Sequence, residues 1–205
     1  MQPFYYFYNM KLSILICALP SRFDKLKMLL YSLKNQTTND VEILYLGDDK
    51  TMSVGTKRNR LIQMAQGQYC TFVDDDDTIS SHYIGELLQT IDNNNGVDVI
   101  CFNVEISING GEWKNVYYSK KYEKDLNFAD HYQRIPNHLM CFRTDLAKKV
   151  LYRDISFGED AQWSKEILPY IESETIIPKT LYYYHANHAT SETLPIRNYN
   201  IRQQK

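Results

Sequence analysis

The chain has 205 residues, 43% of them hydrophobic, and this length suits one compact domain that spans residues 1–205 around a single core. The net charge of -2 excludes a bulk positive field that collects nucleic-acid phosphates, so we expect no nucleic-acid partner. No stretch of about 18 apolar residues occurs, so the sequence predicts no transmembrane segment. The cysteines lie far apart in apolar stretches, which predicts buried free thiols in a reducing, cytoplasmic compartment: Cys17, Cys70, Cys101 and Cys141.

The first residues require a separate interpretation. Residues 10–19 place a lysine before an apolar run, as a secretion signal does, but the run is short, residues 20–22 follow it where small cleavage-site residues would be expected, and Ile16 before Cys17 is too bulky for a lipoprotein cleavage site. A buried first strand explains this run better. The aromatic residues 4–8 remain open between an extra strand and a contact with a partner or a membrane surface. We expect residues 1–10 and the polar residues 198–205 to be peripheral.

Strands and helices alternate through the first half of the chain. The apolar run 12–18 predicts a buried strand, and leucines at helical spacing in residues 26–33 predict a helix that Ser21 caps. Further strands and helices are predicted over residues 41–46, 56–66, 69–73, 84–91 and 97–102. This alternation predicts a mostly parallel sheet covered on both faces, in which ligands bind at the carboxyl ends of the strands.

The rhythm changes after residue 103. Residues 109–112 are a turn sequence, and the segments 104–108 and 113–118 around it predict a hairpin. Weaker signals predict a strand at 138–142, a short helix near Leu146, a helix after Asp160 that Pro169 ends, and a strand at 181–184. We therefore expect a mixed second half.

Four successive aspartates, Asp74, Asp75, Asp76 and Asp77, follow the strand at 69–73. Carboxylates at a strand end converge on the expected ligand crevice, and such close like charges favour a bound cation. Mg²⁺ or Mn²⁺ is suited to carboxylates that leave positions open for substrate phosphates. The alternative is an acidic turn in which Asp77 caps the next helix. A calcium loop is disfavoured because the ligand and glycine spacing of an EF-hand is absent.

Basic residues open the helix at 56–66. Lys57 and Arg58 stand where free backbone N–H groups and a guanidinium favour a bound phosphate. The alternative is an ordinary solvated basic face. Their position just before the aspartates favours the phosphate.

Three segments in this order, residues 55–59, 65–69 and 72–77, resemble the GT-A glycosyltransferases, especially the inverting family 2. The resemblance runs from residue 12 to residue 160 and more faintly to residue 191. It implies an α/β, Rossmann-like three-layer sandwich with a mostly parallel central sheet. It also implies a nucleotide-sugar-binding half over residues 11–103 and an acceptor-binding half over residues 104–190.

The resemblance implies roles for individual residues as well. The donor pocket would be lined by Pro20, Arg22, Asp48, Asp49, Lys57, Arg58, Asp74 and Asp75. The Asp-X-Asp motif of the family maps onto Asp74 and Asp76, with Asp76 the direct metal ligand and Asp74 nearer the ribose; Asp75 could shift this register by one. Residues 50–51 depart from the usual Asp-Asp-Gly-Ser turn, which leaves the base open, and UDP is favoured only by its frequency in the family.

A second family signature falls on residues 157–160, where the carboxylate matching Asp160 serves as the general base, next to Glu159. An acceptor hydroxyl that attacks an anomeric carbon must lose its proton, which a carboxylate within hydrogen-bond reach accepts. A single displacement of this kind predicts inversion. The alternative for Glu159 and Asp160 is favourable charge at a helix N-terminus.

Histidines and one tryptophan complete the candidate site. Many GT-A enzymes use a late histidine as a further metal ligand, a role that the resemblance gives to His185 or His188, with His185 favoured. Trp163 and His138 are candidates for the acceptor side, and packing is the alternative for both.

The sequence thus predicts a metal-dependent inverting glycosyltransferase with Mn²⁺ or Mg²⁺ as cofactor. It would move a sugar from a nucleotide sugar, with UDP-sugar favoured, to a hydroxyl of a polysaccharide or glycan acceptor. Two alternatives stay open. A sugar nucleotidyltransferase is disfavoured because no glycine-rich triphosphate loop with a lysine occurs near residues 18–22. The other is a non-catalytic nucleotide- or glycan-binding module of the same fold.

Overall fold

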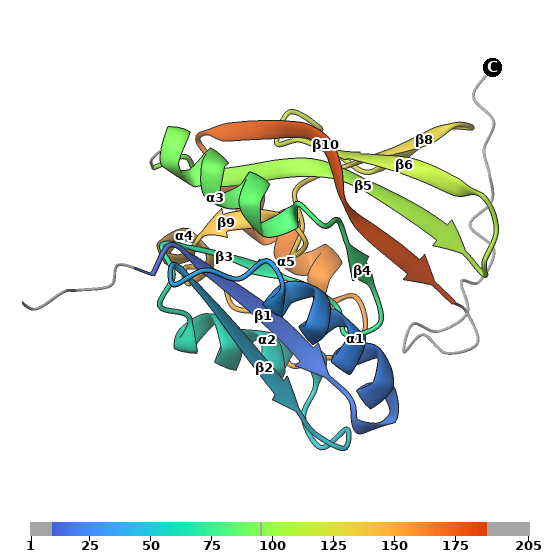
Figure 1. Cartoon of the computed structure of the whole chain (residues 1–205). Coiled ribbons are helices and arrows are strands. Elements are labelled where there is room, and N and C mark those ends of the chain that lie inside the picture. The colour runs from blue at the N-terminus through green and yellow to red at the C-terminus, as the bar shows by residue number, and fades with distance from the viewer. Residues whose placement is uncertain (1–9, 95, 188–205) are drawn as a thin grey trace, which may run out of the picture.

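The computed structural model describes residues 10–94 and 96–187 (Figure 1). The aromatic residues 4–8, His188 and the polar residues 198–205 lie outside the described residues. No helix of the described chain is long and apolar enough to cross a membrane.

The elements follow one another in an order that begins as an α/β alternation and ends in a strand-rich half. They are β1 (Leu12–Ala18), η1 (Pro20–Arg22), α1 (Phe23–Lys34), β2 (Val41–Gly47), α2 (Val54–Met64), β3 (Tyr69–Phe72), β4 (Thr78–Ile79), α3 (Tyr83–Asn93), β5 (Val99–Ile108), β6 (Trp113–Tyr118), β7 (Leu126–Asn127), β8 (His131–Arg134), β9 (Cys141–Arg143), α4 (Thr144–Ala147), α5 (Glu159–Ile167), η2 (Leu168–Tyr170) and β10 (Glu174–Ala186).

One sheet runs through the described chain in the order β2-β1-β3-β9-β5-β6-β8-β7, with β10 paired to β5 and β4. The strands β2, β1 and β3 are parallel, whereas β9 is antiparallel to both β3 and β5. Strand β5 has one neighbour of each direction, because β6 is antiparallel to it and β10 is parallel to it. The predicted α/β class is confirmed, with a parallel first half and a mixed second half.

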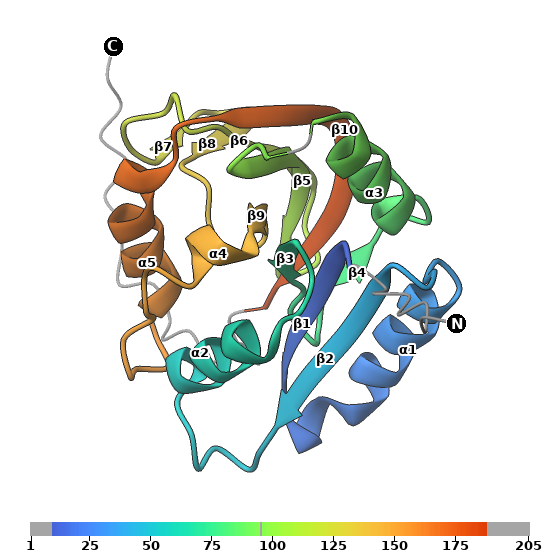
Figure 2. The same cartoon turned by 90° about the vertical axis from the view of Figure 1, so that its left-hand side faces the viewer.

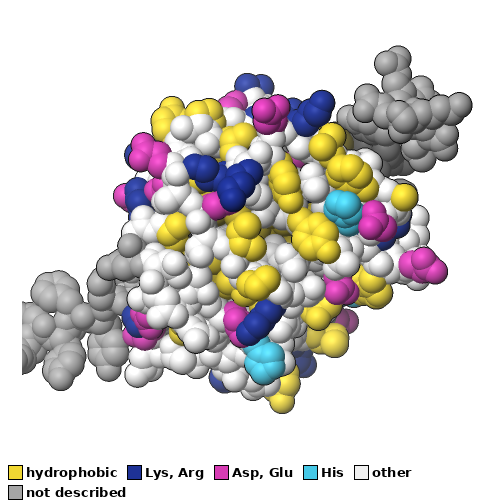
Figure 3. All heavy atoms as spheres, turned by 90° about the horizontal axis from the view of Figure 1, so that it is seen from above, with side chains coloured by type: hydrophobic (Ala, Val, Ile, Leu, Met, Phe, Trp, Pro, Cys, Tyr) yellow, Lys and Arg dark blue, Asp and Glu magenta, His cyan; other side chains and the backbone are white. Residues whose placement is uncertain are grey.

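Helices cover both faces of this sheet (Figure 2). Figure 2 shows α1 and α3 on one side of the sheet and α2 and α5 on the other. The leucines Leu26, Leu29 and Leu33 of α1 are buried, as their helical spacing predicts. The face of the molecule in Figure 3 carries hydrophobic side chains scattered among charged ones, which is ordinary for a protein surface.

Three local predictions are wrong. Ser21 does not cap α1, because the 3₁₀ turn Pro20–Arg22 precedes the helix and its N-cap residue, Arg22, makes no side-chain capping bond. Asp77 does not cap the next helix, because α3 begins only at Tyr83. The separate strands expected at 97–102 and 104–108 form the single strand β5. The prediction of free cysteines is confirmed.

Candidate active site

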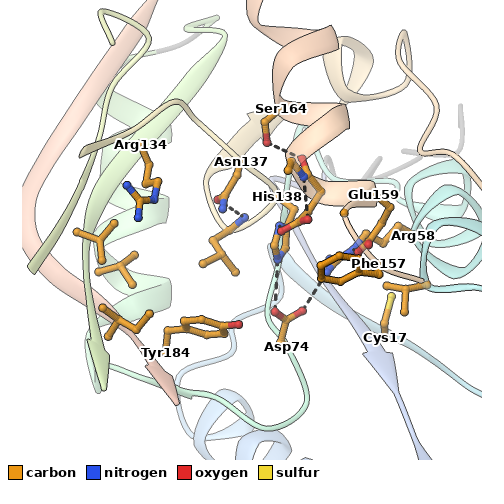
Figure 4. Close-up of a pocket in the computed structure, with 18 of the residues that line it drawn as sticks. Cys17, Arg58, Asp74, Arg134, Asn137, His138, Phe157, Glu159, Ser164 and Tyr184 are labelled. Carbon is orange, nitrogen blue, oxygen red and sulfur yellow. Dashed lines mark hydrogen bonds and ion pairs between the residues drawn. The ribbon is translucent and has the colours of Figure 1, made fainter. Parts of the chain in front are cut away.

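One cavity of the described chain, about 490 Å³ in volume, opens beyond the carboxyl ends of β1 and β3 (Figure 4). The N-terminal end of α5 and strands of the second half close its other sides. The structure brings most predicted site residues to this cavity: Arg22, Lys57, Arg58, Asp74, Asp75, His138, Glu159 and Asp160. Pro20 and Asp49 are exposed and are not among the lining residues.

Each oxygen of the Asp74 carboxylate contacts a different basic side chain. Oδ1 lies 3.2 Å from Nη2 of Arg58, and Oδ2 lies 3.3 Å from Nε2 of His138. Burial alone would raise the pKa of Asp74, but Arg58 and His138 outweigh burial and lower that pKa well below its usual range. Asp74 is therefore an ionised carboxylate at the centre of a charged network.

The guanidinium of Arg58 joins Asp74 to the start of α5. Arg58 is only 4% exposed, and its Nε lies 3.4 Å from Oε1 of Glu159. Its guanidinium carbon also stands 4.7 Å from the centre of the Phe72 ring, a cation–π arrangement. A charge so deeply buried needs partners of opposite sign, which these two carboxylates provide.

His138 joins the same aspartate to Asp160. Its Nδ1 lies 3.7 Å from Oδ2 of Asp160, and the backbone oxygen of His138 accepts a hydrogen bond from Phe72 of β3. Asp160 is more accessible, with 38% of its side chain exposed, and its Oδ1 accepts the N–H of Ala161. Figure 4 shows His138 and Arg58 both above Asp74, each beside a different oxygen of its carboxylate.

The remaining three aspartates of the run have distinct surroundings. Asp75 accepts hydrogen bonds from the backbone N–H of Leu19 and from Arg22, both at 2.9 Å. Arg22 also lies 3.1 Å from Asp76. Burial raises the pKa of Asp75 and of Asp76, an effect that Arg22 opposes. These two carboxylates thus share one guanidinium.

Asp77 anchors β10 in place of capping a helix. Its oxygens accept hydrogen bonds from the hydroxyl of Tyr182 and from the backbone N–H of His185, each at 2.7 Å. Burial and the nearby Asp74 raise its pKa well above the usual range. Asp77 therefore has a structural role, because it attaches β10 to the end of the aspartate run.

The pair Asp48 and Lys57 lies at the end of β2, where the donor base was expected. Nζ of Lys57 stands 2.8 Å from Oδ1 of Asp48, and Lys57 is 2% exposed. The hydrogen bond from Lys57 lowers the pKa of Asp48 to about 2, although burial opposes it. The backbone N–H of Met52 and the hydroxyl of Thr51 also donate to Asp48. Thr51, which departs from the family turn, thus supports the aspartate.

A second cavity of about 580 Å³ lies on the other side of the aspartate run and is bordered by Asp76, Asp77 and His185. The His185 ring packs edge-on to Trp113, and its Nε2 lies 3.0 Å from the hydroxyl of Thr78. Burial lowers the pKa of His185, which keeps the imidazole neutral, the form that binds metals.

The donor set decides whether a metal fits here. In residues 10–94 and 96–187, no three His, Cys, Asp or Glu side chains lie close enough together to hold a metal ion by themselves. Asp76 and His185, however, border one cavity and offer one hard oxygen and one nitrogen. Mg²⁺ and Mn²⁺ sites with one or two carboxylates are completed by water and substrate phosphates, so these residues fit such a site.

The second-half wall of the cavity contains residues that the sequence did not single out. Arg134 and Tyr184 face His138 across the cavity (Figure 4). Tyr182, which is buried, and Tyr184, which lines the cavity, are two residues apart and so share one face of β10, and this period-two spacing could have identified Tyr184. Trp163, in contrast, packs in the core, with its ring stacked on Tyr152 and its Nε1 donating to the backbone of Val150, in agreement with the packing interpretation.

The parallel first half, whose acidic strand ends face an acidic helix start from the mixed second half, has the α/β arrangement of the GT-A class. The protein-family model "Glycosyl transferase family 2" matches residues 52–151, which include α2, the aspartate run and His138. Over residues 52–151 the chain is similar to the family 2 glycosyltransferases, and its fold is that of the GT-A class.

Individual relatives agree with this assignment. An uncharacterized glycosyltransferase of Methanocaldococcus jannaschii, MJ1057, is 25% identical over 58% of this chain and 42% of its own length. The crystal structure of S. aureus TarS 1-349 in complex with UDP matches with a TM-score of 0.68 at 18% identity, over 87% of this chain and 61% of that chain. The complex of the same protein with UDP-GlcNAc matches with a TM-score of 0.64 at 16% identity, over 86% of this chain and 58% of that chain. The chain thus spans between 42% and 61% of the length of these relatives.

Proposed function

We propose that the chain transfers a sugar from a nucleoside-diphosphate sugar, with a UDP-sugar favoured, to a hydroxyl of a glycan or polysaccharide acceptor with inversion. The observation that carries the proposal is that Asp160, an accessible carboxylate, borders the same cavity as the donor-side residues Arg58 and Asp74. The UDP complex of a structural neighbour at 18% identity supports the choice of nucleotide.

Residues at different places along the cavity have different roles in the proposed reaction. Lys57, which lines the cavity and is paired with Asp48 behind it, is suited to the side of the base, and Arg22 lies beside Asp75 and Asp76. Asp160 accepts the proton of the acceptor hydroxyl as that oxygen forms its bond to the anomeric carbon. The bond between the anomeric carbon and the diphosphate breaks in the same displacement, so the configuration inverts and no covalent sugar intermediate is needed.

A divalent cation held by Asp76, with His185 as a further candidate, would neutralise charge on the departing diphosphate. Asp75 and Asp76 share Arg22 as a cationic partner, and burial raises the pKa of both carboxylates, so a second positive charge at this position would relieve their repulsion. Mn²⁺ and Mg²⁺ both suit this oxygen-rich setting.

The first test is a panel of nucleotide sugars with Mn²⁺ or Mg²⁺, scored by thermal stabilisation and by slow release of nucleoside diphosphate. A ligand present at about 100 times its Kd should stabilise the protein by about 2.7 kcal/mol. Release of inorganic diphosphate from a nucleoside triphosphate and a sugar 1-phosphate, supplied in a parallel assay, would identify a nucleotidyltransferase, and binding without any turnover would identify a non-catalytic module. Either result would overturn the proposal.

The second test is the variant Asp160→Asn, which removes the proton acceptor and preserves the shape of the side chain. We expect metal-dependent donor binding to remain and transfer to fall by about 100- to 10,000-fold, the usual contribution of a general base. Asp145→Asn is the matched control, because Asp145 is an exposed carboxylate on α4 paired only with Arg143 in the described chain. Unchanged transfer in Asp160→Asn would remove Asp160 from the mechanism.

A further inference from the structure

Two adjacent acidic residues at the start of α5 are linked to one aspartate at the end of β3, each through a different basic side chain. Arg58 joins Glu159 to Oδ1 of Asp74, and His138 joins Asp160 to Oδ2 of Asp74. The first link is a buried ion pair of ordinary kind. The second contains the side chain to which we give the role of general base.

Asp160 by itself is poorly fixed for that role. Its side chain is 38% exposed, and the hydrogen bond that it accepts from Ala161 is a local contact at the helix start. A carboxylate on an accessible helix end can adopt several rotamers, and a general base must stay within hydrogen-bond reach of one oxygen. The side chain therefore needs an anchor.

His138 has the properties of such an anchor. It is 6% exposed, its ring packs edge-on to Phe72, and its backbone oxygen is hydrogen-bonded to the N–H of Phe72. Nε2 faces Asp74, whereas the buried Nδ1 has no hydrogen-bond partner in the described chain and faces Oδ2 of Asp160 at 3.7 Å. The ring is thus rigidly placed and directed toward the base.

We propose that His138 is a positioning residue, which holds the Asp160 carboxylate toward the acceptor hydroxyl and ties it to Asp74 on the donor side. The inference rests on the proposed function, because it concerns the same transfer reaction. It differs from the acceptor-lining role that the sequence indicates for His138, since the buried Nδ1 atom faces the carboxylate of Asp160.

The two ring nitrogens allow a sharp test, because two amide side chains mimic them separately. The amide nitrogen of asparagine can occupy the position of Nδ1, and that of glutamine the position of Nε2. We expect His138→Asn to retain the link to Asp160 and most of kcat. We expect His138→Gln, which retains only the link to Asp74, to lose between about tenfold and a hundredfold in kcat, the effect of a small misplacement of a reacting group. The KM for the donor should change less than about threefold in both variants, because donor contacts remain.

The controls separate positioning from folding and from failure of the proposed function. His82→Gln changes an exposed histidine at the start of α3 and should leave kcat and Tm unaltered. Donor-induced thermal stabilisation shows that each variant is folded. Asp160→Asn and the double variant with His138→Gln should have equally low kcat, because a misplaced base and an absent base affect the same step.

Three results would overturn the inference. One is a kcat within twofold of the wild type for His138→Gln while Asp160→Asn abolishes transfer. Another is an equal loss of kcat in the asparagine and glutamine variants together with an equal loss of Tm, which indicates packing alone. The third is full transfer by Asp160→Asn, which refutes the proposed function of Asp160 as the base. The activity of Asp160→Asn separates this result from the first one, in which that variant is inactive.

Discussion

The buried guanidinium of Arg58 allows a prediction whose size follows from its contacts. Arg58→Met removes the partner of both Asp74 and Glu159 and also the contact with the Phe72 ring. Breaking a buried ion pair by removing one partner costs about 3–5 kcal/mol. We expect the lower end, about 3 kcal/mol, because Asp74 keeps His138 and Glu159, whose pKa is already raised by burial, can bind a proton.

For a chain of this length each kcal/mol corresponds to about 2–4 °C in Tm, so Arg58→Met should melt about 6–12 °C lower. Arg58→Lys, which keeps the charge but reaches one carboxylate at a time, should lose less. Adding Glu159→Gln to Arg58→Met should recover part of the loss, because one of the two orphaned carboxylates is removed.

The pH dependence of this loss has a definite sign. Burial raises the folded pKa of Glu159 above its usual 4.5, and Arg58 opposes that rise. Without Arg58 the folded pKa of Glu159 rises further. A carboxyl group whose folded pKa is raised lowers the stability of the protein as the pH increases from the unfolded pKa through the folded pKa. The Tm deficit of Arg58→Met should therefore be larger at pH 8 than at pH 5.

Thermal melts monitored by circular dichroism measure these differences, with Arg60→Met as the control on the exposed side of the same helix. A surface change of this kind should cost no more than about 0.5 kcal/mol. Equal Tm values for Arg58→Met and Arg60→Met, or a deficit that shrinks toward high pH, would refute the account of Arg58 as the shared partner of two buried carboxylates.

Two further predictions concern the metal and the donor base. Asp76→Ala should lower turnover and weaken Mn²⁺-dependent donor binding by about 10- to 100-fold in calorimetric titrations. After chelator treatment, the wild type and the variant should bind the donor equally weakly. Unaltered Mn²⁺-dependent donor affinity would contradict the assignment of Asp76 as a metal ligand. Asp48→Asn should lower Tm at neutral pH because Lys57 holds the folded pKa of Asp48 at about 2, below the unfolded 3.8. The stability from this depressed pKa is present above pH 3.8 and is lost as the pH falls through 2, so the Tm values of wild type and variant should converge in that window, and a constant gap would contradict it.

The first half of the fold could be predicted from local patterns alone. Apolar runs and helical leucine spacing identify β1 and α1 because each element buries one set of side chains against the same sheet. The aspartates follow β3 directly in the sequence, so their place at a strand end needed no tertiary information. Chain order also places α2 beside β1 in a right-handed unit.

The contacts that define the site could not be predicted in this way. Arg22 and Asp75 are 53 residues apart, and His138 and Asp74 are 64 residues apart. No periodicity links such pairs, because β9, which follows His138 in the chain, lies antiparallel between β3 and β5 although it is distant from both in sequence. The parallel pairing of β8 with β6 was missed for the same reason.

The aspartate run shows how the fold assigns different chemistry to identical residues. Backbone direction at the end of β3 directs Asp74 toward Arg58 and His138, whereas Asp75 faces Leu19 and Arg22. Asp76 borders the second cavity, and Asp77 holds the hydroxyl of Tyr182.

Asp74, Asp76 and Asp77 should therefore each cause a different defect when they are changed singly to asparagine. Loss of the Asp74 charge leaves Arg58 with Glu159 alone and His138 with Asp160 alone, and it should lower both stability and kcat because the anchor of His138 is weakened. Loss of Asp77 affects the attachment of β10 and should lower stability first. Loss of Asp76 leaves its neighbours with less repulsion and should spare stability while metal-dependent donor binding declines. A common phenotype for all three variants would mean that the run acts only as a pool of negative charge, and the individual contacts would then carry no separate function.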